Sequence, residues 1–455
     1  MNIKPNKKIL CLLIFCNLFM SVTGVSAFEN PGHQHNEELL NIQNHKSSNI
    51  ISVNQAQQNK EFTNKSISRT IGTFKQLNKE IQEAIENNKT VIELNCDYYY
   101  YKQEDKDLNE GIAINKNIII NGNGHTIDGS EMARAFKISA KEVTINQLYI
   151  KNTKSNNGGA IYSEKTNLNI NQSLFEENSA TDSTFTQCKG GSIYSEDGIL
   201  NIYHSTFNNN NAEDYGGAVY SNKKIILNNC EFNNNLASDN DGGAVYCKEN
   251  INVINTNFKE NKAYEDGGAL YSEKNIDINN SKFEKNLANG AKVSQCEGGA
   301  VYANGPITVN NSKFNNNKAY DYGGAIWTNN DITLRDCSFM DNSVSDNDGG
   351  AIYSDGSRIK AYNNDFINNH ADSKGGVIYC DDGSSNTYLE DNNFVNNSCG
   401  SNKGSSVYTD GYFSKICNNW WGTPTPNWGS GLLWEDTWNS HIIHHDESPR
   451  TQPRS

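Results

Sequence analysis

An aromatic residue recurs about every 25 residues along the middle of the chain, each time at the end of a motif of the form Gly-Gly-Ala-Ile/Val-Tyr. If the aliphatic residue before each ring points inward, strand alternation turns the rings outward along one face. Aromatic faces offer contact area to sugars and peptides at low entropic cost, so we take these residues as a candidate binding site. The alternative is that neighbouring rings only stack and stabilise a sheet. The ten positions are Tyr162, Tyr194, Tyr220, Tyr246, Tyr271, Tyr302, Trp327, Tyr353, Tyr379 and Tyr408.

Acidic residues recur in the turns that precede the same motif, at Asp214, Asp239, Asp241, Asp266, Asp321, Asp346 and Asp348. Repetition of this kind is typical of a solvated acidic stripe, whereas glycoside hydrolysis needs one pair of carboxylates at a defined separation. The Asp-Asn-Asp runs at 239–241 and 346–348 could bind Ca²⁺, although their spacing matches no known calcium loop. His125 and Asp128, in a turn rich in Asn and Gly, are the alternative catalytic candidates. We expect no catalytic residue and no resident cofactor or metal.

The period of the repeat indicates how these residues are positioned. Each unit carries one strand signal at the aromatic motif and a second before a Phe-x-x-Asn motif, with turns rich in Gly, Asn and Asp between them. Short strands at a fixed period without crossover helices predict an all-β fold, a single right-handed parallel β-helix of about 10–12 coils. A β-propeller would need about 40 residues per blade. The Asn three residues after each Phe is predicted to form a structural ladder along the stack.

The ends of the chain predict export and closure of the stack. Lys4, Lys7 and Lys8 precede an apolar run, so residues 1–27 are expected to be a signal peptide cleaved near Ala27, with no later membrane segment. Residues 28–70 are expected to be a flexible polar linker. A capping box at Thr73 and a helical pattern (Phe74, Leu77, Ile81, Ile85) predict a lid helix. The expected units are an N-terminal cap at 71–110, β-helix repeats at 111–415, a Trp-rich cap at 416–440 and a polar tail at 441–455.

Charge and cysteine usage narrow the classes of partner. The formal net charge of −14 argues against nucleic acid and anionic membranes and favours cations or neutral glycans. The expected partners are glycans or the surfaces of other cells, and the chain is expected to be a monomer. Nine cysteines follow the signal. Cys230 and Cys337 occupy a column that is elsewhere Ser or Thr, and they are too far apart for a bridge. We therefore predict buried free thiols.

The Gly-Gly-Ala-Ile and Phe-x-x-Asn pair resembles the repeat of bacterial polymorphic outer-membrane proteins, which are surface adhesins. Over roughly residues 70–435 the chain is similar to adhesin-like β-helix proteins of methanogenic archaea. The shared features are the signal peptide, the helix, the turn at 121–129, the coils, and the Asn419-Trp420-Trp421-Gly422 ending. The resemblance implies a β-helix on the cell surface or secreted from the cell.

Three functions remain open at this point. The first is an adhesin-like protein that binds glycans or other cells through a repetitive side face. The second is a pectate-lyase-like or polygalacturonase-like enzyme, because parallel β-helices also carry such enzymes and fold alone does not decide function. The third is a passive structural or shielding protein. We rank binding first, shielding second and catalysis third.

Overall fold

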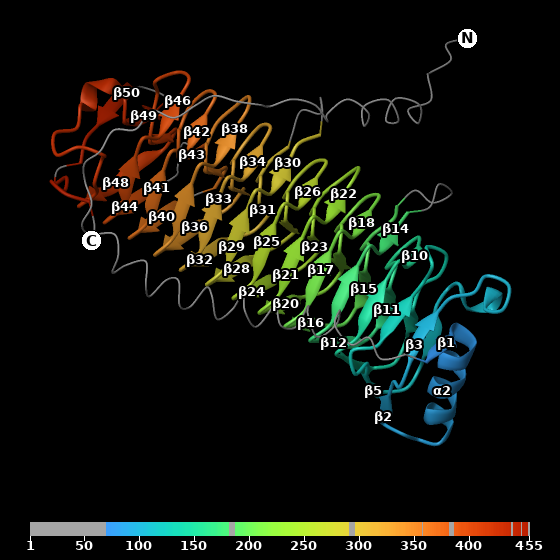
Figure 1. Ribbon diagram of the computed structural model, residues 1–455. Coiled ribbons are helices and arrows are strands. Elements are labelled where there is room, and N and C mark those ends of the chain that lie inside the picture. Colours follow the sequence, from blue (N-terminus) through green and yellow to red (C-terminus); the bar gives the residue numbers. More distant parts are fainter. Residues whose placement is uncertain are drawn as a thin grey trace, which may run out of the picture. The chain divides into compact units, whose positions relative to one another are not determined.

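The computed structural model describes residues 70–181, 187–290, 296–356, 358–381, 386–437, 440–446 and 448–453. The predicted signal peptide, Trp438 and all of the predicted linker except Thr70 lie outside the described residues. The described residues all belong to one compact unit. Its described part is a single right-handed parallel β-helix of about 13 turns (Figure 1). This is slightly more than expected, because the region before Gly158 adds coils that lack the Gly-Gly motif.

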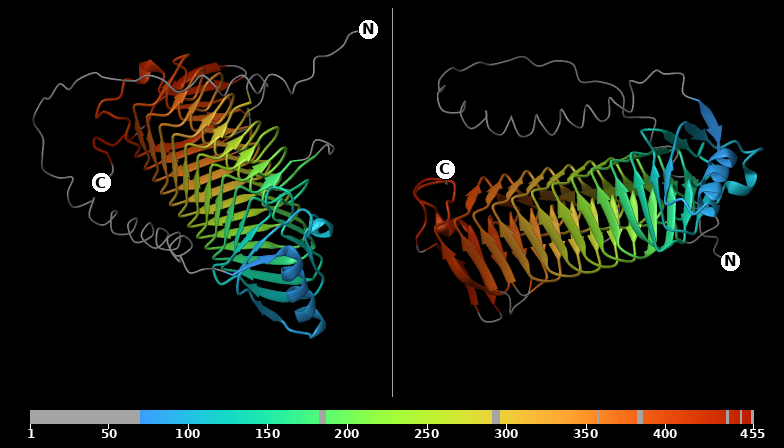
Figure 2. Two further views of the ribbon diagram at one scale, coloured as in Figure 1. Left: turned by 45° about the vertical axis from the view of Figure 1, so that its right-hand side comes forward. Right: turned by 90° about the horizontal axis from the view of Figure 1, so that it is seen from below.

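Four sheets, here named A to D, run along the stack, and each coil contributes one strand to a sheet (Figure 2). Sheet A contains β1 (Ile71–Thr73), β3 (Asp97–Tyr99), β6 (Thr126–Asp128), β9 (Tyr149–Lys151), β13 (Leu174–Glu176), β17 (Thr206–Asn208), β21 (Glu231–Asn233), β25 (Asn257–Lys259), β29 (Lys282–Glu284), β33 (Lys313–Asn315), β37 (Ser338–Met340), β41 (Asp365–Ile367) and β45 (Asn393–Val395). Sheet B contains β2 (Val91–Glu93), β5 (Ile118–Asn121), β8 (Glu142–Asn146), β12 (Asn167–Asn171), β16 (Leu200–Tyr203), β20 (Ile225–Asn228), β24 (Ile251–Ile254), β28 (Ile276–Asn279), β32 (Ile307–Asn310), β36 (Ile332–Arg335), β40 (Arg358–Tyr362), β44 (Asn386–Glu390) and β48 (Tyr412–Cys417).

Sheet C carries the aromatic motif. It contains β4 (Ile112–Ile114), β7 (Phe136–Ile138), β11 (Ile161–Lys165), β15 (Ile193–Asp197), β19 (Val219–Ser221), β23 (Val245–Cys247), β27 (Leu270–Ser272), β31 (Val301–Ala303), β35 (Ile326–Thr328), β39 (Ile352–Ser354), β43 (Ile378–Cys380), β47 (Val407–Thr409), β49 (Leu433–Thr437) and β50 (Ser440–His444). Sheet D has two-residue strands, β10 (Lys154–Ser155), β14 (Ser179–Ala180), β18 (Asn211–Ala212), β22 (Leu236–Ala237), β26 (Lys262–Ala263), β30 (Leu287–Ala288), β34 (Lys318–Ala319), β38 (Ser343–Val344), β42 (His370–Ala371) and β46 (Ser398–Cys399). The described helical segments are α2 (Phe74–Glu86), η3 (Lys106–Leu108) and η4 (Trp428–Ser430).

The interior is built from columns of like residues. In the coil that begins at β19, Val219, Ile225, Leu227 and Phe232 are all fully buried. Residue-to-residue register between coils places Phe232 on Phe258, with ring centroids 5.0 Å apart and nearly parallel planes. The alternating apolar spacing of each strand therefore sends one face into a continuous core.

The predicted asparagine ladder is present and buried. Asn261 shows its bonding: Nδ2 donates to the carbonyl of Phe232 (2.9 Å) and to Oδ1 of Asn286 (3.0 Å). Its own Oδ1 accepts from the backbone N–H and the side-chain amide of Asn235. Each asparagine thus forms hydrogen bonds with backbone groups at the corner between sheets A and D. Such pairing is needed because N–H and C=O groups buried at this corner cannot bond to water.

Asn261→Ala is expected to lower the free energy of unfolding by about 3 kcal/mol, because it leaves the Asn235 N–H buried and unpaired and removes the hydrogen bonds to the Phe232 carbonyl and to the Asn235 and Asn286 amides. Denaturant unfolding followed by circular dichroism measures this change. Asn252→Ala, on the outer face of β24, is the control and should change the stability by less than about 0.5 kcal/mol. Equal effects of the two substitutions would contradict the structural role of the ladder.

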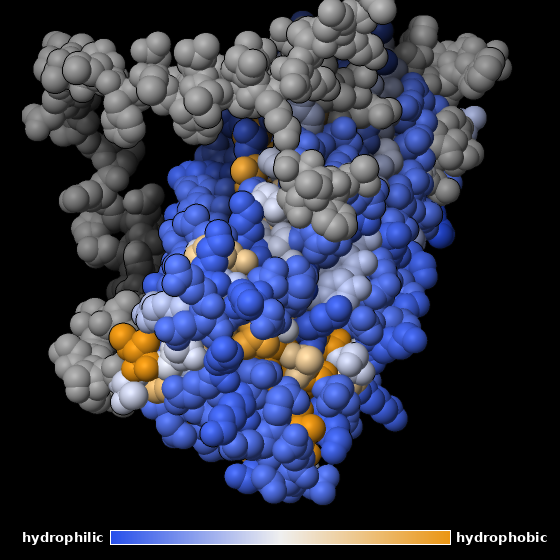
Figure 3. All heavy atoms as spheres, turned by 90° about the vertical axis from the view of Figure 1, so that its right-hand side faces the viewer, coloured by the Kyte–Doolittle hydropathy of each residue, from blue (hydrophilic) through white to orange (hydrophobic). Residues whose placement is uncertain are grey.

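A helix covers the end of the core at the first coil, as the sequence predicts. The side chain of Thr73 accepts the N–H of Gln76 at 3.2 Å, and α2 buries Phe74, Leu77, Ile81 and Ile85. The surface at this end is largely hydrophilic with scattered apolar patches (Figure 3). Ile71, Val91 and Tyr101 are among its exposed hydrophobic residues.

At the other end, aromatic residues close the core. Trp421 stacks on Phe394 with centroids 4.6 Å apart, and Trp428 packs edge-on against Trp421. Sheet C ends in the antiparallel pair β49–β50, which stops the parallel stacking. This part of the Trp-rich segment therefore acts as a plug, whereas Trp434 lies in β49 and extends the aromatic column of sheet C.

The nine cysteines of the described residues are free thiols, and all but Cys417 are buried. The Cys230 thiol donates to the carbonyl of Ile202 at 3.3 Å, and that of Cys337 donates to the carbonyl of Arg335 at 3.1 Å. Burial raises the pKa of Cys230 to about 12 and that of Cys337 to about 11. The thiols thus replace Ser and Thr hydroxyls at interior positions, as the column pattern predicts.

A thiol-reactive dye is expected to label Cys417 first in the native protein and the buried cysteines only after unfolding, because reaction requires an accessible thiolate. Cys417→Ser should remove the first reacting group. Rapid labelling of the buried thiols in the native state, or a stability that falls on addition of reductant, would contradict this account.

Candidate functional site

The ten aromatic residues of the motif form one continuous column on the outer side of sheet C, here called the aromatic ladder. Strand register pairs each ring with the next, for example Tyr162 with Tyr194 and Tyr194 with Tyr220. Neighbouring ring centroids lie 4.3–5.2 Å apart with nearly parallel planes. The one wider gap is 6.5 Å, between Trp327 and Tyr353.

Access to the ladder differs along its length. Tyr162, Tyr194 and Tyr271 are half-buried. The other seven have exposed fractions of 1–9%, and five of them, from Tyr302 to Tyr408, pack into one apolar cluster with Tyr322 and Trp434. The rings point away from the β-helix core, but most present only their edges to solvent. Stacking on both faces is the physical reason, because a ring between two others has no free face.

The hydroxyl ends of the rings meet a second column of carboxylates and amides, two residues further along each strand. Tyr162 donates to Glu196 at 2.9 Å and Tyr246 to Glu273 at 2.8 Å. At the far end Tyr379 donates to Asp410 at 2.9 Å. Each of these pairs joins adjacent coils, so the polar column ties the coils together and offers hydrogen-bond acceptors beside the rings.

A third column covers the opposite side of the ladder and consists of the residue just before each Gly pair. Lys189 lies over the rings of Tyr215 and Tyr220, at 5.4 and 4.9 Å from their centroids. Lys374 lies 4.5 Å from the centroid of Tyr408. Since these contacts shield the rings from water, the turn residues explain much of the burial of the ladder.

Three consecutive members of this turn column are acids: Asp241, Asp266 and Glu297. Asp241 and Glu297 are each only 9% exposed. Oδ1 of Asp241 accepts the N–H of Asp266 at 3.1 Å, and Oδ1 of Asp266 accepts the N–H of Glu297 at 2.8 Å. Burial raises the pKa of Asp241 and of Glu297 to about 7, and the pKa of Asp266 also lies well above its ordinary value.

The prediction of a solvated acidic stripe is therefore correct for Asp239 and Asp346, which are exposed, but wrong for Asp214, Asp241 and Asp321. The buried carboxylates accept hydrogen bonds within the turns: Asn240 donates to Asp214 and Asn347 to Asp321. In the described residues no group of His, Cys, Asp and Glu has an arrangement suited to a metal ion. In the two Asp-Asn-Asp runs, Asp241 and Asp348 each accept a backbone N–H of the next coil.

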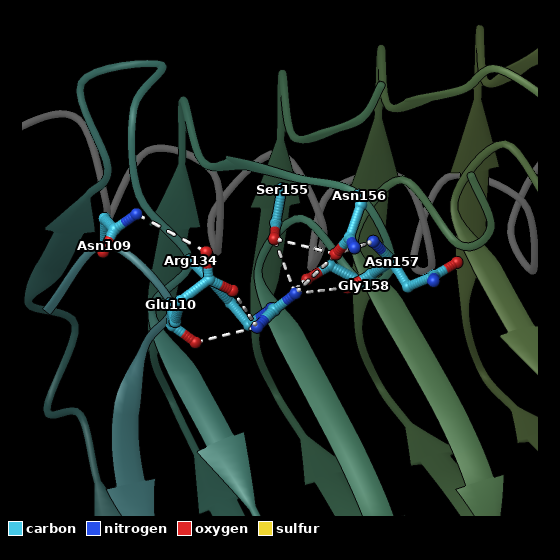
Figure 4. A network of polar contacts seen from close by, with 7 residues as sticks. All are labelled: Asn109, Glu110, Arg134, Ser155, Asn156, Asn157 and Gly158. Atoms are coloured by element: carbon cyan, nitrogen blue, oxygen red, sulfur yellow. Dashed lines mark hydrogen bonds and ion pairs between the residues drawn. The ribbon is translucent and has the colours of Figure 1, made fainter. Parts of the chain in front are cut away.

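Arg134 lies just before β7, in the coil that precedes the first ring of the ladder, and is almost fully buried (Figure 4). Its guanidinium donates to the carbonyls of Glu110, Asn157 and Gly158 at 2.7–3.0 Å, and to the hydroxyl of Ser155 at 2.5 Å. It also lies 5.3 Å from the centroid of the Tyr162 ring. All three nitrogen atoms of the guanidinium donate hydrogen bonds, so the role of Arg134 is structural. Its guanidinium covers the outer face of the first ring of the ladder.

His125 and Asp128 do not form a catalytic pair with each other. His125 Nδ1 lies 3.2 Å from Oδ1 of Asp97, which also accepts the N–H of Thr126. Asp128 accepts from the Ser130 N–H and the Asn152 amide, and lies 3.6 Å from the Lys151 ammonium. Both residues are engaged in contacts of the early coils.

Sequence comparison gives one family and two negative results. The Chlamydia polymorphic membrane protein repeat matches residues 204–222, 229–248, 255–273, 311–329, 336–355 and 365–381. No curated protein and no solved structure shows significant similarity to the chain. The repeats and the β-helix together fit a surface-exposed, adhesin-like repeat protein. In the described residues no helix has the length and apolarity needed to cross a membrane. The similarity to archaeal proteins stays a prediction.

Sequence reasoning missed three residues of this site. Trp434 pairs with Tyr408 as an eleventh ring, and the matching interval from Tyr408 was a usable signal, although the Gly pair is absent there. Tyr215 packs against Tyr246 at 4.9 Å and Tyr322 against Tyr353 at 4.5 Å. Tyr215 and Tyr322 both stand directly before a Gly pair, but the other units have different residue types at that position, so the sequence shows no aromatic pattern there.

Proposed function

We propose that this protein is a surface adhesin-like β-helix that binds glycans through the accessible first rungs of the aromatic ladder. The observation that carries the proposal is the pair of half-buried rings Tyr162 and Tyr194, with a carboxylate bonded to the hydroxyl of the first. Tyr162 lies beside Glu196, and cations of Arg134 and Lys137 lie 5.3 and 5.9 Å from its ring centroid. The exposed edges and hydroxyls of these rings, with the Glu196 carboxylate beside them, offer a sugar both apolar contact and hydrogen-bond partners.

Shielding is the second candidate, and one observation favours it. Seven of the ten rungs are less than 10% exposed, so most of the ladder supports the stack rather than a ligand. A rod whose thiols and rings are buried and whose corners are hydrogen-bonded would resist unfolding on a cell surface. Catalysis remains the third candidate function, because the carboxylates of the turn column accept hydrogen bonds from backbone N–H groups.

The experiment uses the full chain, a panel of neutral cell-wall and plant polysaccharides, and whole cells of other species. Retention on the solid and sugar released into the supernatant are both measured. Tyr162→Ala/Tyr194→Ala should weaken retention at least about tenfold, since each lost aromatic contact removes about 1 kcal/mol. Tyr412→Ala is the control, because Tyr412 is 53% exposed and lies outside the ladder.

Two results would contradict the proposal. Sugar release by the unaltered chain would point to an enzyme. Equal retention by both variants would place binding elsewhere or leave shielding as the function. Thermal unfolding of Tyr162→Ala/Tyr194→Ala checks that lost binding is not lost folding. Its comparison is Tyr162→Phe/Tyr194→Phe, which keeps the stacked rings and removes only the hydroxyls.

A further inference from the structure

A compact group of lysines stands out on this acidic chain. Lys259, Lys262, Lys282, Lys285, Lys313 and Lys318 are all exposed and lie within three consecutive coils on sheets A and D. We call this surface the lysine platform. Figure 1 shows its strands side by side, β25, β29 and β33 in sheet A and β26, β30 and β34 in sheet D. The platform lies on sheets other than the one that carries the aromatic ladder.

Strand register brings the like charges together. Lys282 lies directly opposite Lys313, and Lys262 and Lys318 occupy the same column on either side of Leu287. Like charges placed directly opposite one another destabilise a sheet. The platform therefore lowers the free energy of unfolding, whereas the asparagine and aromatic ladders raise it. An arrangement that lowers stability in this way is typical of a surface used for binding.

Only part of this charge is neutralised within the chain. Lys285 lies 3.6 Å from Glu260 and 3.9 Å from Glu284, and Lys259 lies 3.9 Å from Glu260. In the described residues no acidic partner is found for Lys262, Lys282, Lys313 or Lys318. Six lysines therefore face two glutamates on a protein with a net charge of −14.

The surroundings restrict what can approach. Glu231 on β21, and Asp341 and Asp365 beyond β37, border the platform along the stack. The platform spans about 10 Å from its first coil to its third, comparable to the screening length of about 8 Å in physiological salt. A broad anionic surface would meet the bordering acids, whereas a thin chain can contact the lysines alone.

The side chains also discriminate between thin polyanions. In the sheet A and sheet D strands of these three coils, the outward positions hold Lys, Asn, Glu and Leu. Two half-buried tyrosines, Tyr264 and Tyr320, follow β26 and β34, and the ring of Tyr264 lies against Gly290. The strands themselves therefore offer no aromatic platform on which a nucleobase could stack. They hold no arginine, whose planar fork suits phosphate. Lysines act as point charges and fit single carboxylates or sulfates spaced along a chain.

We infer that the lysine platform binds a short stretch of a linear anionic polysaccharide, such as one with a uronic acid at each sugar. A pyranose unit is about as long as the distance between neighbouring coils, so successive charges can meet lysines of successive coils. This surface is separate from the aromatic ladder, and its test can fail while the ladder proposal stands.

The test measures binding of the full chain to polygalacturonate by calorimetry, at low and at physiological salt. Dextran, a single-stranded oligonucleotide and phosphatidylserine vesicles serve as comparison probes. The platform variant changes Lys262, Lys282, Lys313 and Lys318 to Gln. The control variant changes four exposed lysines elsewhere, Lys102, Lys141, Lys165 and Lys274, to Gln, which gives the same change in net charge.

Polygalacturonate should bind the unaltered chain and the control, lose affinity at least about tenfold in the platform variant, and bind more weakly as salt rises. The Tyr162→Ala/Tyr194→Ala variant should bind it normally. Equal loss in the control variant would overturn the proposal, as would tighter binding of the oligonucleotide or the vesicles, or no binding of polygalacturonate at low salt.

Discussion

Gly217→Ala is expected to destabilise the β-helix by roughly 4 kcal/mol or more. A Cβ at this position would lie 2.1 Å from the carbonyl oxygen of Gly243 and 2.5 Å from the carbonyl carbon of Leu236. Both contacts are to backbone of the next coil, which cannot turn aside as a side chain can. The second glycine of each pair therefore sets how closely successive coils approach, and this is the physical reason for its recurrence.

Denaturant unfolding of Gly217→Ala is best compared with that of Gly422→Ala. Gly422 has a φ of +77°, but the nearest atom to a Cβ there is 3.5 Å away. Its replacement should cost only the backbone strain of about 1–2 kcal/mol. If Gly217→Ala is no worse than Gly422→Ala, the close approach of successive coils does not depend on the glycine, and the packing argument is wrong.

The protein is expected to be more stable at pH 5 than at pH 8, by several kcal/mol. Asp241 and Glu297 have pKa values raised to about 7 by burial, with nearby acids adding to the rise. In the folded chain these groups hold protons at pH values where the unfolded chain has lost them. Stability is therefore greatest near pH 4 and falls as the pH rises toward about 7. The rise for Asp241 alone corresponds to roughly 4 kcal/mol.

Unfolding free energies measured from pH 5 to pH 8 check this prediction. Asp241→Asn should flatten the dependence, because the amide oxygen can still accept the Asp266 N–H but carries no charge to bury. The net negative charge of the chain acts in the same direction, since its self-repulsion grows as acids ionise. Stability that rises between pH 5 and pH 8 would show that these carboxylates are solvated.

The sequence predicts the architecture well because the repeat itself carries the information. A fixed period, alternating apolar residues such as Ile225 and Leu227, and an Asn three residues after each Phe leave few other folds. The Thr73 cap is a local signal, and the helix begins where that signal predicts. These features depend on neighbours along the chain or one period away, which is why a single sequence is enough.

The candidate site was less predictable because it depends on how turns fold over a neighbouring column. Strand alternation places the rings on the outer side of sheet C, but it does not show that Tyr220 is only 1% exposed. That burial arises from stacking on both faces and from Lys189 in a turn. The raised pKa of Asp241 has the same origin, since its turn lies against the ladder and excludes water.

Retention of the full chain on neutral polysaccharides, compared with that of Tyr162→Ala/Tyr194→Ala, tests the central claim most directly. Binding through the first rungs of the ladder predicts retention without sugar release, and at least about tenfold weaker retention of a variant that still unfolds cooperatively. Undiminished retention of the folded variant, or release of sugar, would contradict the claim.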